Sequence, residues 1–377
     1  MSLPHLTETP PRFTGHYFAV GFSPWKRPLV RTFLPHAQLT FARTLHLVPP
    51  DASLIVWGRT LDDSIQRAIQ SGQRAAHTPV LRLEDGFLRS VGLGASLTKP
   101  VSWVIDPLGI YYDPTTPSAL EHLLQTHPFP EPLLERAQKL IDRILALNLT
   151  KYNVGTSTWT PPSTQRPLFL VPGQVEYDAS IQYGTPRGPL GIRTNLALLQ
   201  AVRKAHPEAF LLYKPHPDVL AGLRARGPEE TKALSACDAV VTDVSMGDLL
   251  PLVEQVHVMT SLTGFEALLR GKTVVCYGTP FYAGWGLTED RVPIPRRDRT
   301  LSLRQLVAAS LLLYPTYVHP ETRQQIPAET ALEALATLRK KTAATSRNVL
   351  SLCLHKISCT ILSLHNKRHD LKRARQV

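Results

Sequence analysis

The fold class of this chain is decided by residues 168–213, which read LFLVPGQVEYDASIQYGTPRGPLGIRTNLALLQAVRKAHPEAFLLY. An apolar run, Leu168–Val171, precedes an amphipathic stretch of helical length, Asn195–Ala205, and a second apolar run, Phe210–Tyr213, follows it. Runs that are apolar at every position are typical of parallel strands that are covered on both faces. The segment therefore predicts a strand, a helix and a second strand of an α/β protein.

The same alternation extends outward in both directions. Further strands are predicted at Tyr17–Gly21, Leu54–Trp57, Val80–Leu83, Val101–Ile105, Ala239–Thr242, His257–Met259 and Thr273–Tyr277, and further helices at Leu120–Leu124, Leu133–Leu147 and Phe265–Arg270. The polar segment 151–166 interrupts the pattern and predicts a linker. We therefore expect two Rossmann-like domains, residues 1–150 and 167–338, that face each other across a cleft.

Length and composition agree with a folded two-domain protein. The chain has 377 residues, and single cores stop growing at roughly 250–300 residues. Its four cysteines form no CxxC pair and have no histidine at zinc spacing, so neither a disulfide framework nor a zinc site is expected. The first residues lack the pattern of a signal peptide, and no run of about 20 apolar residues occurs, so we expect a cytoplasmic protein.

The basic charge is concentrated at the end of the chain. Residues 339–377 contain ten Lys or Arg and one acid, Asp370, and so carry +9 of the formal net charge of +12. The nearly neutral body argues against nucleic-acid binding. An apolar stripe at helical spacing within 349–364 predicts an amphipathic helix that attaches this basic tail to the anionic inner face of the cytoplasmic membrane. The alternative is a helix that packs its stripe onto the body.

Five motifs follow predicted strands, and the first is LEDGFLRS at 83–90. Glu84 or Asp85 at a strand end can serve as general base for an acceptor hydroxyl. The alternative is a turn in which Asp85 caps and Gly86 supplies a positive φ.

The second motif, VPGQVEYDAS at 171–180, offers Glu176 and Asp178 beside a polar Gln174. Asp178 can act as a nucleophile toward an anomeric carbon, or it can simply cap the following helix.

The third and fourth motifs contain groups that suit a phosphate. In YKPHPDV at 213–219, Lys214 and His216 between stiff prolines predict a cationic clamp, or else a plain proline turn. In HVMTSLTGFEA at 257–267, Thr263 and Glu266 match a capping box, while His257, Thr260 and Ser261 beside a helix start favour an anion site.

The fifth motif, YGTPFYAGWGL at 277–287, places Tyr282 and Trp285 in a glycine-rich loop that lines a sugar or base pocket, or else packs the loop. Ligands of such sheets bind beyond the carboxyl ends of the strands, where all five motifs lie. Together they predict a cleft for a phosphate-bearing donor.

Seven strings jointly resemble the KpsC-type capsular polysaccharide β-Kdo transferases: GFSPWKRP, RLEDGFLRSVGLGA, GIYYDPTTPSALEHLL, VPGQVEYDAS, YKPHPDVLAG, MTSLTGFEALLRGK and YGTPFYAGWGL. The wording VPGQVEYDAS is most similar to the carboxyl-terminal catalytic module of that family. The resemblance implies a GT-B fold, CMP-β-Kdo as donor, retention of anomeric configuration and a lipid-linked Kdo oligosaccharide as acceptor. Known members often join two modules, whereas this chain holds one, so a companion Kdo transferase and the capsule export machinery are expected partners.

The resemblance also implies roles for individual residues. Asp178 would be the nucleophile and Glu84 the acid/base. Lys214, His216, Pro217, Thr260 and Ser261 would hold the CMP phosphate, with Glu266 near the ribose. The remaining expected substrate-binding residues are Asp85, Gly86, Arg89, Gln174, Glu176, Ser180, His257, Tyr282 and Trp285.

No catalytic metal or other cofactor is expected. A monophosphate donor has no pyrophosphate that needs a divalent clamp, and no DxD string follows a predicted strand.

Two other hypotheses remain open. The chain could use another CMP-activated ulosonic acid, which donor-specific hydrolysis would reveal. It could instead be a non-catalytic capsule assembly or export factor that binds glycolipid, in which case Asp178 and Glu84 would be replaceable.

Overall fold

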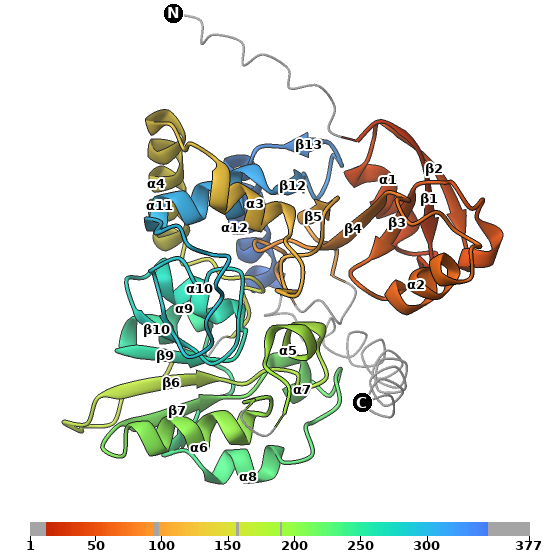
Figure 1. Cartoon of the computed structure of the whole chain (residues 1–377). Helices are drawn as coiled ribbons and strands as arrows, with labels where there is room; N and C mark the ends of the chain where they lie inside the picture. The colour runs from red at the N-terminus through yellow and green to blue at the C-terminus, as the bar shows by residue number, and fades with distance from the viewer. Residues whose placement is uncertain (1–12, 93–97, 156–157, 189–190, 346–377) are drawn as a thin grey trace, which may run out of the picture.

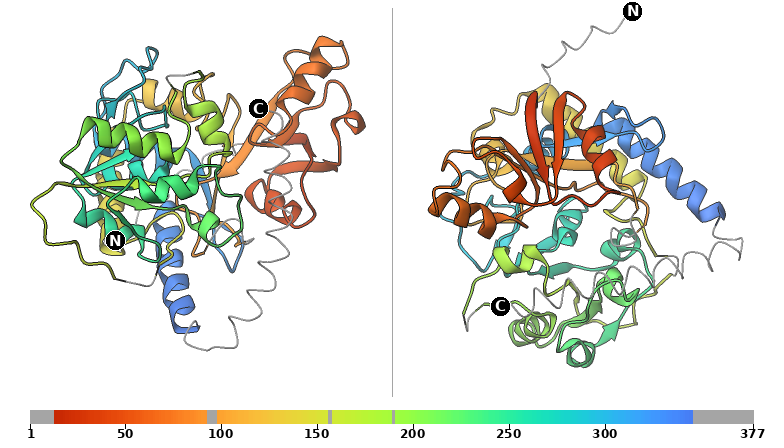
Figure 2. Two further views of the ribbon diagram at one scale, coloured as in Figure 1. Left: turned by 90° about the horizontal axis from the view of Figure 1, so that it is seen from below. Right: turned by 90° about the vertical axis from the view of Figure 1, so that its right-hand side faces the viewer.

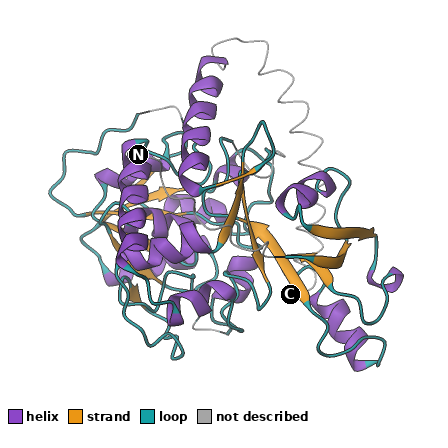
Figure 3. Cartoon of the chain, turned by 90° about the horizontal axis from the view of Figure 1, so that it is seen from above, coloured by secondary structure: helices purple, strands orange, loops and turns teal. Residues whose placement is uncertain are grey.

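A computed structural model describes residues 13–92, 98–155, 158–188 and 191–345 (Figure 1). Two β-sheets, each flanked by helices, make up this part of the chain. Figure 3 shows most of the helices gathered in one half of the molecule, and Figure 1 shows the first strands of the chain (red) to one side. The predicted α/β class is confirmed.

The first sheet has seven strands in the order β13-β12-β5-β4-β3-β1-β2. Their bounds are β1 Gly15–Val20, β2 Ala37–Ala42, β3 Leu54–Trp57, β4 Val80–Asp85, β5 Ser102–Asp106, β12 Pro315–Val318 and β13 Gln325–Ile326. Strands β2, β1, β3 and β4 are parallel, but β5 is antiparallel to β4 and to β12. The expectation of a purely parallel first sheet is wrong, because a fully buried apolar strand has the same pattern in either direction.

The second sheet has six parallel strands in the order β11-β10-β9-β6-β7-β8, as predicted for this half. Their bounds are β6 Leu168–Pro172, β7 Phe210–Lys214, β8 Ala239–Val240, β9 Gln255–Val258, β10 Thr273–Cys276 and β11 Glu289–Asp290. Every residue of β6 is buried, which explains its continuous apolar run.

The helices are α1 Arg27–Phe33, α2 Asp62–Gln70, α3 Ala119–Thr126, α4 Glu131–Ala146, α5 Ala179–Gly184, α6 Asn195–Ala205, α7 Pro217–Leu220, α8 Glu230–Ser235, α9 Met246–Leu249, α10 Leu262–Leu268, α11 Leu303–Val307 and α12 Ala328–Thr345. Short turns of other helix types occur at Leu45–Leu47, Leu250–Leu252 and Ala308–Leu313. Helix α6 has its predicted bounds because the Thr194 hydroxyl accepts a hydrogen bond from the Ala197 amide at 3.1 Å.

After the second sheet the chain returns to the first. Residues 315–326 were expected in the second domain, but β12 and β13 extend the first sheet, beside β5 in Figure 1. The Tyr314 hydroxyl donates at 2.8 Å to the buried carboxylate of Asp106, the last residue of β5. Helix α12 then packs on α4, and Figure 2 shows it (blue) on the outside of the molecule. The return was not predicted because β13 has only two residues and β12, with the sequence PTYV, lacks a continuous apolar run.

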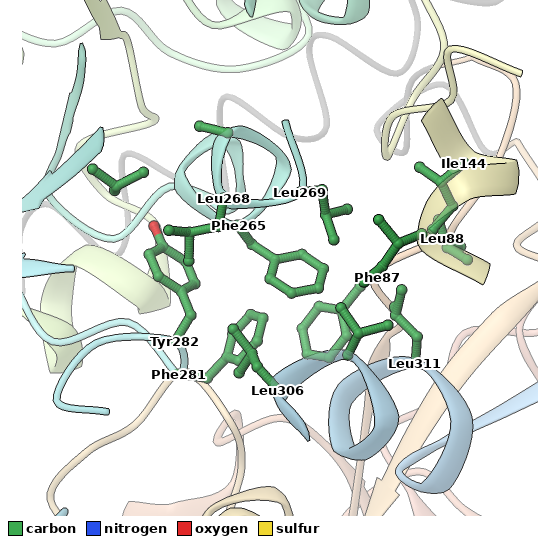
Figure 4. Close-up of a cluster of buried hydrophobic side chains, with 14 of the residues drawn as sticks. Phe87, Leu88, Ile144, Phe265, Leu268, Leu269, Phe281, Tyr282, Leu306 and Leu311 are labelled. Carbon is green, nitrogen blue, oxygen red and sulfur yellow. The ribbon is translucent and has the colours of Figure 1, made fainter. Parts of the chain in front are cut away.

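One continuous hydrophobic core joins the two sheets. Phe87, which follows β4, stacks on Phe281, which follows β10, with ring centroids 4.4 Å apart. Phe265 of α10 lies 5.3 Å from Phe281, and Figure 4 shows the three rings pointing toward one another. Leu306 and Leu311 from the returning segment close the same cluster. The relative position of the strand ends of both sheets therefore depends on this packing.

We predict that Phe87→Ala lowers the free energy of unfolding by about 3–5 kcal/mol, because it leaves a cavity in the shared core. Urea denaturation and scanning calorimetry measure the change. Leu47→Ala is the matched control, since Leu47 is 68% exposed. A Phe87→Ala protein as stable as this control would contradict the role assigned to the aromatic cluster.

Candidate active site

A cavity of about 2000 Å³ lies where the strand ends of both sheets meet. Its walls come from the loops after β1, β3 and β4 in the first sheet and after β6, β7 and β9 in the second. Twelve of the predicted site residues line it: Glu84, Asp85, Arg89, Gln174, Asp178, Ser180, Lys214, His216, Pro217, Thr260, Ser261 and Glu266. These residues are far apart in sequence but lie together at the strand ends, where ligands of such sheets bind.

Gly86 does not line the cavity, and its backbone φ is not positive. A Cβ on Gly86 would lie 2.3 Å from the Ser102 hydroxyl oxygen. Glycine is therefore needed here for close packing of β4 against β5. The alternative of a positive-φ turn is wrong, and the position of Gly86 does not support the expected contact with substrate.

Glu176, His257, Tyr282 and Trp285 also lie outside the cavity wall. Glu176 accepts a hydrogen bond from the Asn195 amide at 2.7 Å. His257 is fully buried, and burial together with the neighbouring His206 lowers its pKa to about 3. The positions of these residues do not support the expected direct contacts with substrate.

Tyr282 and Trp285 support the loop from inside the core instead. Both side chains are fully buried. The Tyr282 hydroxyl donates to the Ser261 carbonyl oxygen, and the Trp285 indole donates to the Phe281 carbonyl oxygen at 2.9 Å. Of the two readings of this aromatic motif, loop packing is the one that the geometry supports.

Glu84 and Asp85 are adjacent at the end of β4 but differ in acidity. Burial, followed by the neighbouring Asp85, raises the pKa of Glu84 to about 7. Desolvation also acts to raise the pKa of Asp85, but Arg89 at 2.6 Å outweighs that effect and lowers it. The Trp103 indole donates a second hydrogen bond to Asp85 at 3.2 Å. Glu84 is thus the member of the pair that can exchange a proton near neutral pH.

Asp178 caps α5 and at the same time faces the cavity. One carboxylate oxygen accepts from the Ser180 amide at 3.0 Å, and the other lies 4.0 Å from the Arg224 guanidinium. Burial opposes ionisation, but Arg224 and the Ser180 amide outweigh it and lower the pKa of Asp178. The capping role and the chemical role are therefore compatible, because the cap keeps the carboxylate ionised and fixed in direction.

His216 and Lys214 differ from the expected cationic clamp. Nδ1 of His216 accepts from the Asp218 amide at 3.2 Å, so Nε2 is the nitrogen that carries the proton of the neutral ring. Burial lowers the pKa of His216 below its usual 6.5, so the ring is mainly neutral at pH 7 and donates one hydrogen bond. Burial also lowers the pKa of Lys214, whose ammonium donates to the Thr242 carbonyl at 3.1 Å.

Helix α10 begins two residues earlier than the predicted capping box at Thr263 and Glu266 required. Its N-cap is Ser261, which accepts from the Thr263 amide at 3.2 Å, and Glu266 instead accepts from the Lys151 amide at 2.7 Å. The capping-box prediction is wrong because neighbouring hydroxyl residues compete for the same cap. Gln174 exchanges two hydrogen bonds with Thr260, at 2.9 and 3.0 Å, and so joins the β6 loop to the β9 loop.

Several further residues line the cavity without having been predicted. Lys26 lies over the Trp57 ring at 3.2 Å, and Arg59 lies over the Tyr183 ring at 4.4 Å, which connects the two halves. Lys26 belongs to the string GFSPWKRP, which contains no carboxylate or histidine that would indicate a site. Lys151 belongs to the segment interpreted as a linker.

Two absences hold for the described residues. They contain no group of three or more His, Cys, Asp or Glu side chains arranged to hold a metal ion. None of their helices has the length and apolarity needed to cross a bilayer.

Comparison with known proteins agrees with this fold. Residues 52–319 match the model of the family described as capsule polysaccharide biosynthesis protein. The chain is 44% identical to the capsule polysaccharide modification protein LipA of Neisseria meningitidis serogroup B, over 90% of this chain and 48% of LipA. It is 40% identical to the lipopolysaccharide-processing protein LpsZ of Rhizobium meliloti, over 84% of this chain and 73% of LpsZ. The chain thus spans about half the length of LipA.

Two solved structures confirm the resemblance to KpsC. The β Kdo 2,7 transferase of Thermosulfurimonas dismutans KpsC superposes with a TM-score of 0.71 and 40% identity, over 86% of this chain and 99% of that one. The β Kdo 2,4 transferase of the same protein superposes with a TM-score of 0.70 and 30% identity, over 84% and 97%. The chain belongs to the capsule polysaccharide biosynthesis protein family.

Proposed function

We propose that this chain is a retaining, GT-B-type β-Kdo transferase that uses CMP-β-Kdo as its donor. The observation that carries the proposal is the pairing of an ionised Asp178 with a Glu84 whose pKa is about 7, in one cavity. Two carboxyl groups whose environments separate their pKa values are typical of an acid/base residue and a nucleophile. The 40% identity with a β Kdo 2,7 transferase supports the same activity and favours a 2,7 linkage.

In the first step, a carboxylate oxygen of Asp178 attacks the anomeric carbon of the donor sugar. The bond from that carbon to the phosphate oxygen breaks, and CMP leaves with the electron pair. A low pKa suits Asp178 for this role, because the nucleophile is ready without a proton transfer.

In the second step, Glu84 takes the proton of the acceptor hydroxyl as its oxygen attacks the same carbon. The bond to Asp178 breaks, and the carboxylate is restored. Two successive inversions give net retention, as in retaining glycosidases. A Glu84 with a pKa near 7 is partly ionised at neutral pH and so can accept this proton.

The phosphate of CMP would be held by the opposite wall. Nε2 of His216 and the hydroxyls of Thr260 and Ser261 supply donors there, and all three residues line the cavity. A monophosphate leaving group needs no divalent clamp, so the proposed reaction is independent of metal. Glu266 remains the proposed ribose contact.

Attachment to the inner face of the cytoplasmic membrane remains a proposal. The predicted tail helix within 349–364 lies outside the described residues. Two basic residues at the start of the tail, Arg339 and Lys341, lie within the described residues. Arg339 donates to the Leu147 and Asn148 carbonyls at 3.2 and 2.8 Å, and Lys341 pairs with Glu321 at 3.0 Å. Both side chains have partners on the body, so the more distant basic residues would provide the membrane contact. A lipid-linked Kdo acceptor, a companion transferase and the export machinery remain proposed partners.

Asp178→Ala should reduce Kdo transfer from CMP-Kdo to a Kdo-primed acceptor by about a thousandfold or more, because the variant lacks the proposed nucleophile. The Glu84→Gln variant should form the covalent adduct of Kdo with Asp178 but should not transfer the Kdo to the acceptor. Intact-protein mass spectrometry should therefore detect one added Kdo. Asp142→Ala, on the exposed face of α4, is the control. Full activity of Asp178→Ala, with retention confirmed by NMR, would exclude the proposed nucleophile.

Transfer should rise with pH through about 7 at saturating donor, because only ionised Glu84 can accept the hydroxyl proton. The raised pKa means that most Glu84 is protonated at about pH 6 and ionised at about pH 8. The Glu84→Gln variant should lose this limb of the profile. An unchanged limb in that variant would assign the titration to another group.

His216→Ala and Ser261→Ala should each weaken CMP binding about tenfold, since each removes one hydrogen bond to a charged phosphate. Isothermal titration calorimetry with CMP measures the change. His122→Ala on the exposed side of α3 is the control. Wild-type affinity in both cavity variants would place the nucleotide elsewhere.

A further inference from the structure

The main chain at Lys151 is held by both halves of the molecule. The Ser90 amide donates to the Lys151 carbonyl at 3.2 Å, and the Gly92 amide donates to the Tyr152 carbonyl at 2.9 Å. From the other half, the Glu266 carboxylate accepts the Lys151 amide at 2.7 Å. A segment that sequence alone presents as a linker is therefore fixed at the junction of the two halves.

The side chain of Lys151 lies among the groups that carry the proposed chemistry. It lines the cavity together with Glu84, Asp85, Asp178 and His216. It interacts electrostatically with each of these four groups, two from each half of the molecule. Its position is thus central to the two carboxyl groups of the proposed mechanism.

The Lys151 ammonium has no hydrogen-bond or ion-pair partner among the described residues. It lies 5.3 Å from the centroid of the Tyr152 ring. Burial opposes its charge, but Tyr152 and Asp85 outweigh that effect and raise the pKa of Lys151, so the side chain is charged. A partly buried ammonium with three donors and no fixed acceptor suits an anionic ligand.

Other cations of the cavity are already engaged. Arg89 donates to Asp85 and to the Ser90 hydroxyl, at 2.6 and 2.9 Å. Lys214 donates to the Thr242 carbonyl, and Lys26 lies against Trp57.

The three other cations that line the cavity are placed less well for this ligand. Arg59 pairs with Asp62 and Asp113. Arg224 faces Asp178 at 4.0 Å, and Arg187 is exposed. Lys151 therefore combines a charged head, a central position and free hydrogen-bonding capacity.

The chemistry of a 2-ulosonic acid determines where its own carboxylate must lie. That carboxylate is bonded directly to the anomeric carbon. In the proposed mechanism Asp178 attacks this carbon first, and the acceptor oxygen, which lies beside Glu84, attacks it second. Nucleophile and donor carboxylate are both negative, so a cation between them is needed to offset their repulsion. We propose that Lys151 binds the carboxylate of the 2-ulosonate donor and so selects acidic sugars attached to CMP. This assignment rests on the proposed function.

Measuring two ligands, CMP-Kdo and CMP, with variants of Lys151 tests this assignment. Lys151→Met should raise the KM for CMP-Kdo about 10- to 100-fold, because a charge-assisted hydrogen bond is lost, while the Kd for CMP alone stays within about twofold. Lys151→Arg, which keeps the charge, should recover most of the affinity for CMP-Kdo. Lys139→Met on the exposed face of α4 is the control. Equal losses for CMP and CMP-Kdo would mean that Lys151 binds phosphate, and would overturn the proposal.

A second measurement uses the wild-type protein and needs no variant. With CMP-Kdo as substrate, free Kdo should inhibit at least about tenfold better than its methyl ester, which lacks the negative charge. The difference should disappear in Lys151→Met. Equal inhibition by acid and ester in an active wild-type enzyme would overturn the Lys151 assignment but not the transferase function. A wild-type protein that does not turn over CMP-Kdo would overturn both.

Discussion

The stacking of Phe87 on Phe281 is the contact on which the geometry of the site depends. Phe87 lies three residues after Glu84, and the residue after Phe281 is Tyr282, whose hydroxyl binds the Ser261 carbonyl. The two rings thus connect the loop of the acid/base candidate with the loop of the phosphate candidates. Because protein cores are close-packed, a change at this contact would move both loops. Tyr282 and Trp285 of the fifth motif do not line the cavity and serve this packing instead.

Around this core, the cavity separates the acidities of its carboxyl groups by giving each a different neighbour. Asp85 has Arg89 and Asp178 has Arg224, whereas Glu84 has a like charge beside it and little water. The same burial keeps His216 neutral, so it acts as a directed donor and not as a second cation. The proposed chemistry therefore depends on which neighbour each carboxyl group has, more than on the number of charged groups in the cavity.

The return of the chain to the first sheet adds a further constraint. Tyr314 binds Asp106, whose carboxylate also accepts the amides of Leu108, Gly109 and Ala119. One buried carboxylate thus organises the end of β5, the start of α3 and the returning segment. Such a network is costly to leave incomplete, because each buried donor would lose its partner. Through this network, residues more than 200 positions apart in sequence stabilise the first sheet.

The local pattern of residues was sufficient for the α/β class and for the parallel second sheet, and together with the resemblance to the KpsC-type family it identified twelve of the residues that line the cavity. These features follow from periodicity and from the position of polar groups after apolar runs, and both are properties of neighbouring residues. The motifs could not decide between a cap and a nucleophile at Asp178, since both roles use the same carboxylate. They also missed the antiparallel β5 and the central position of Lys151. Strand direction and the meeting of distant loops are determined by contacts between segments remote in sequence, so only the tertiary structure could decide them.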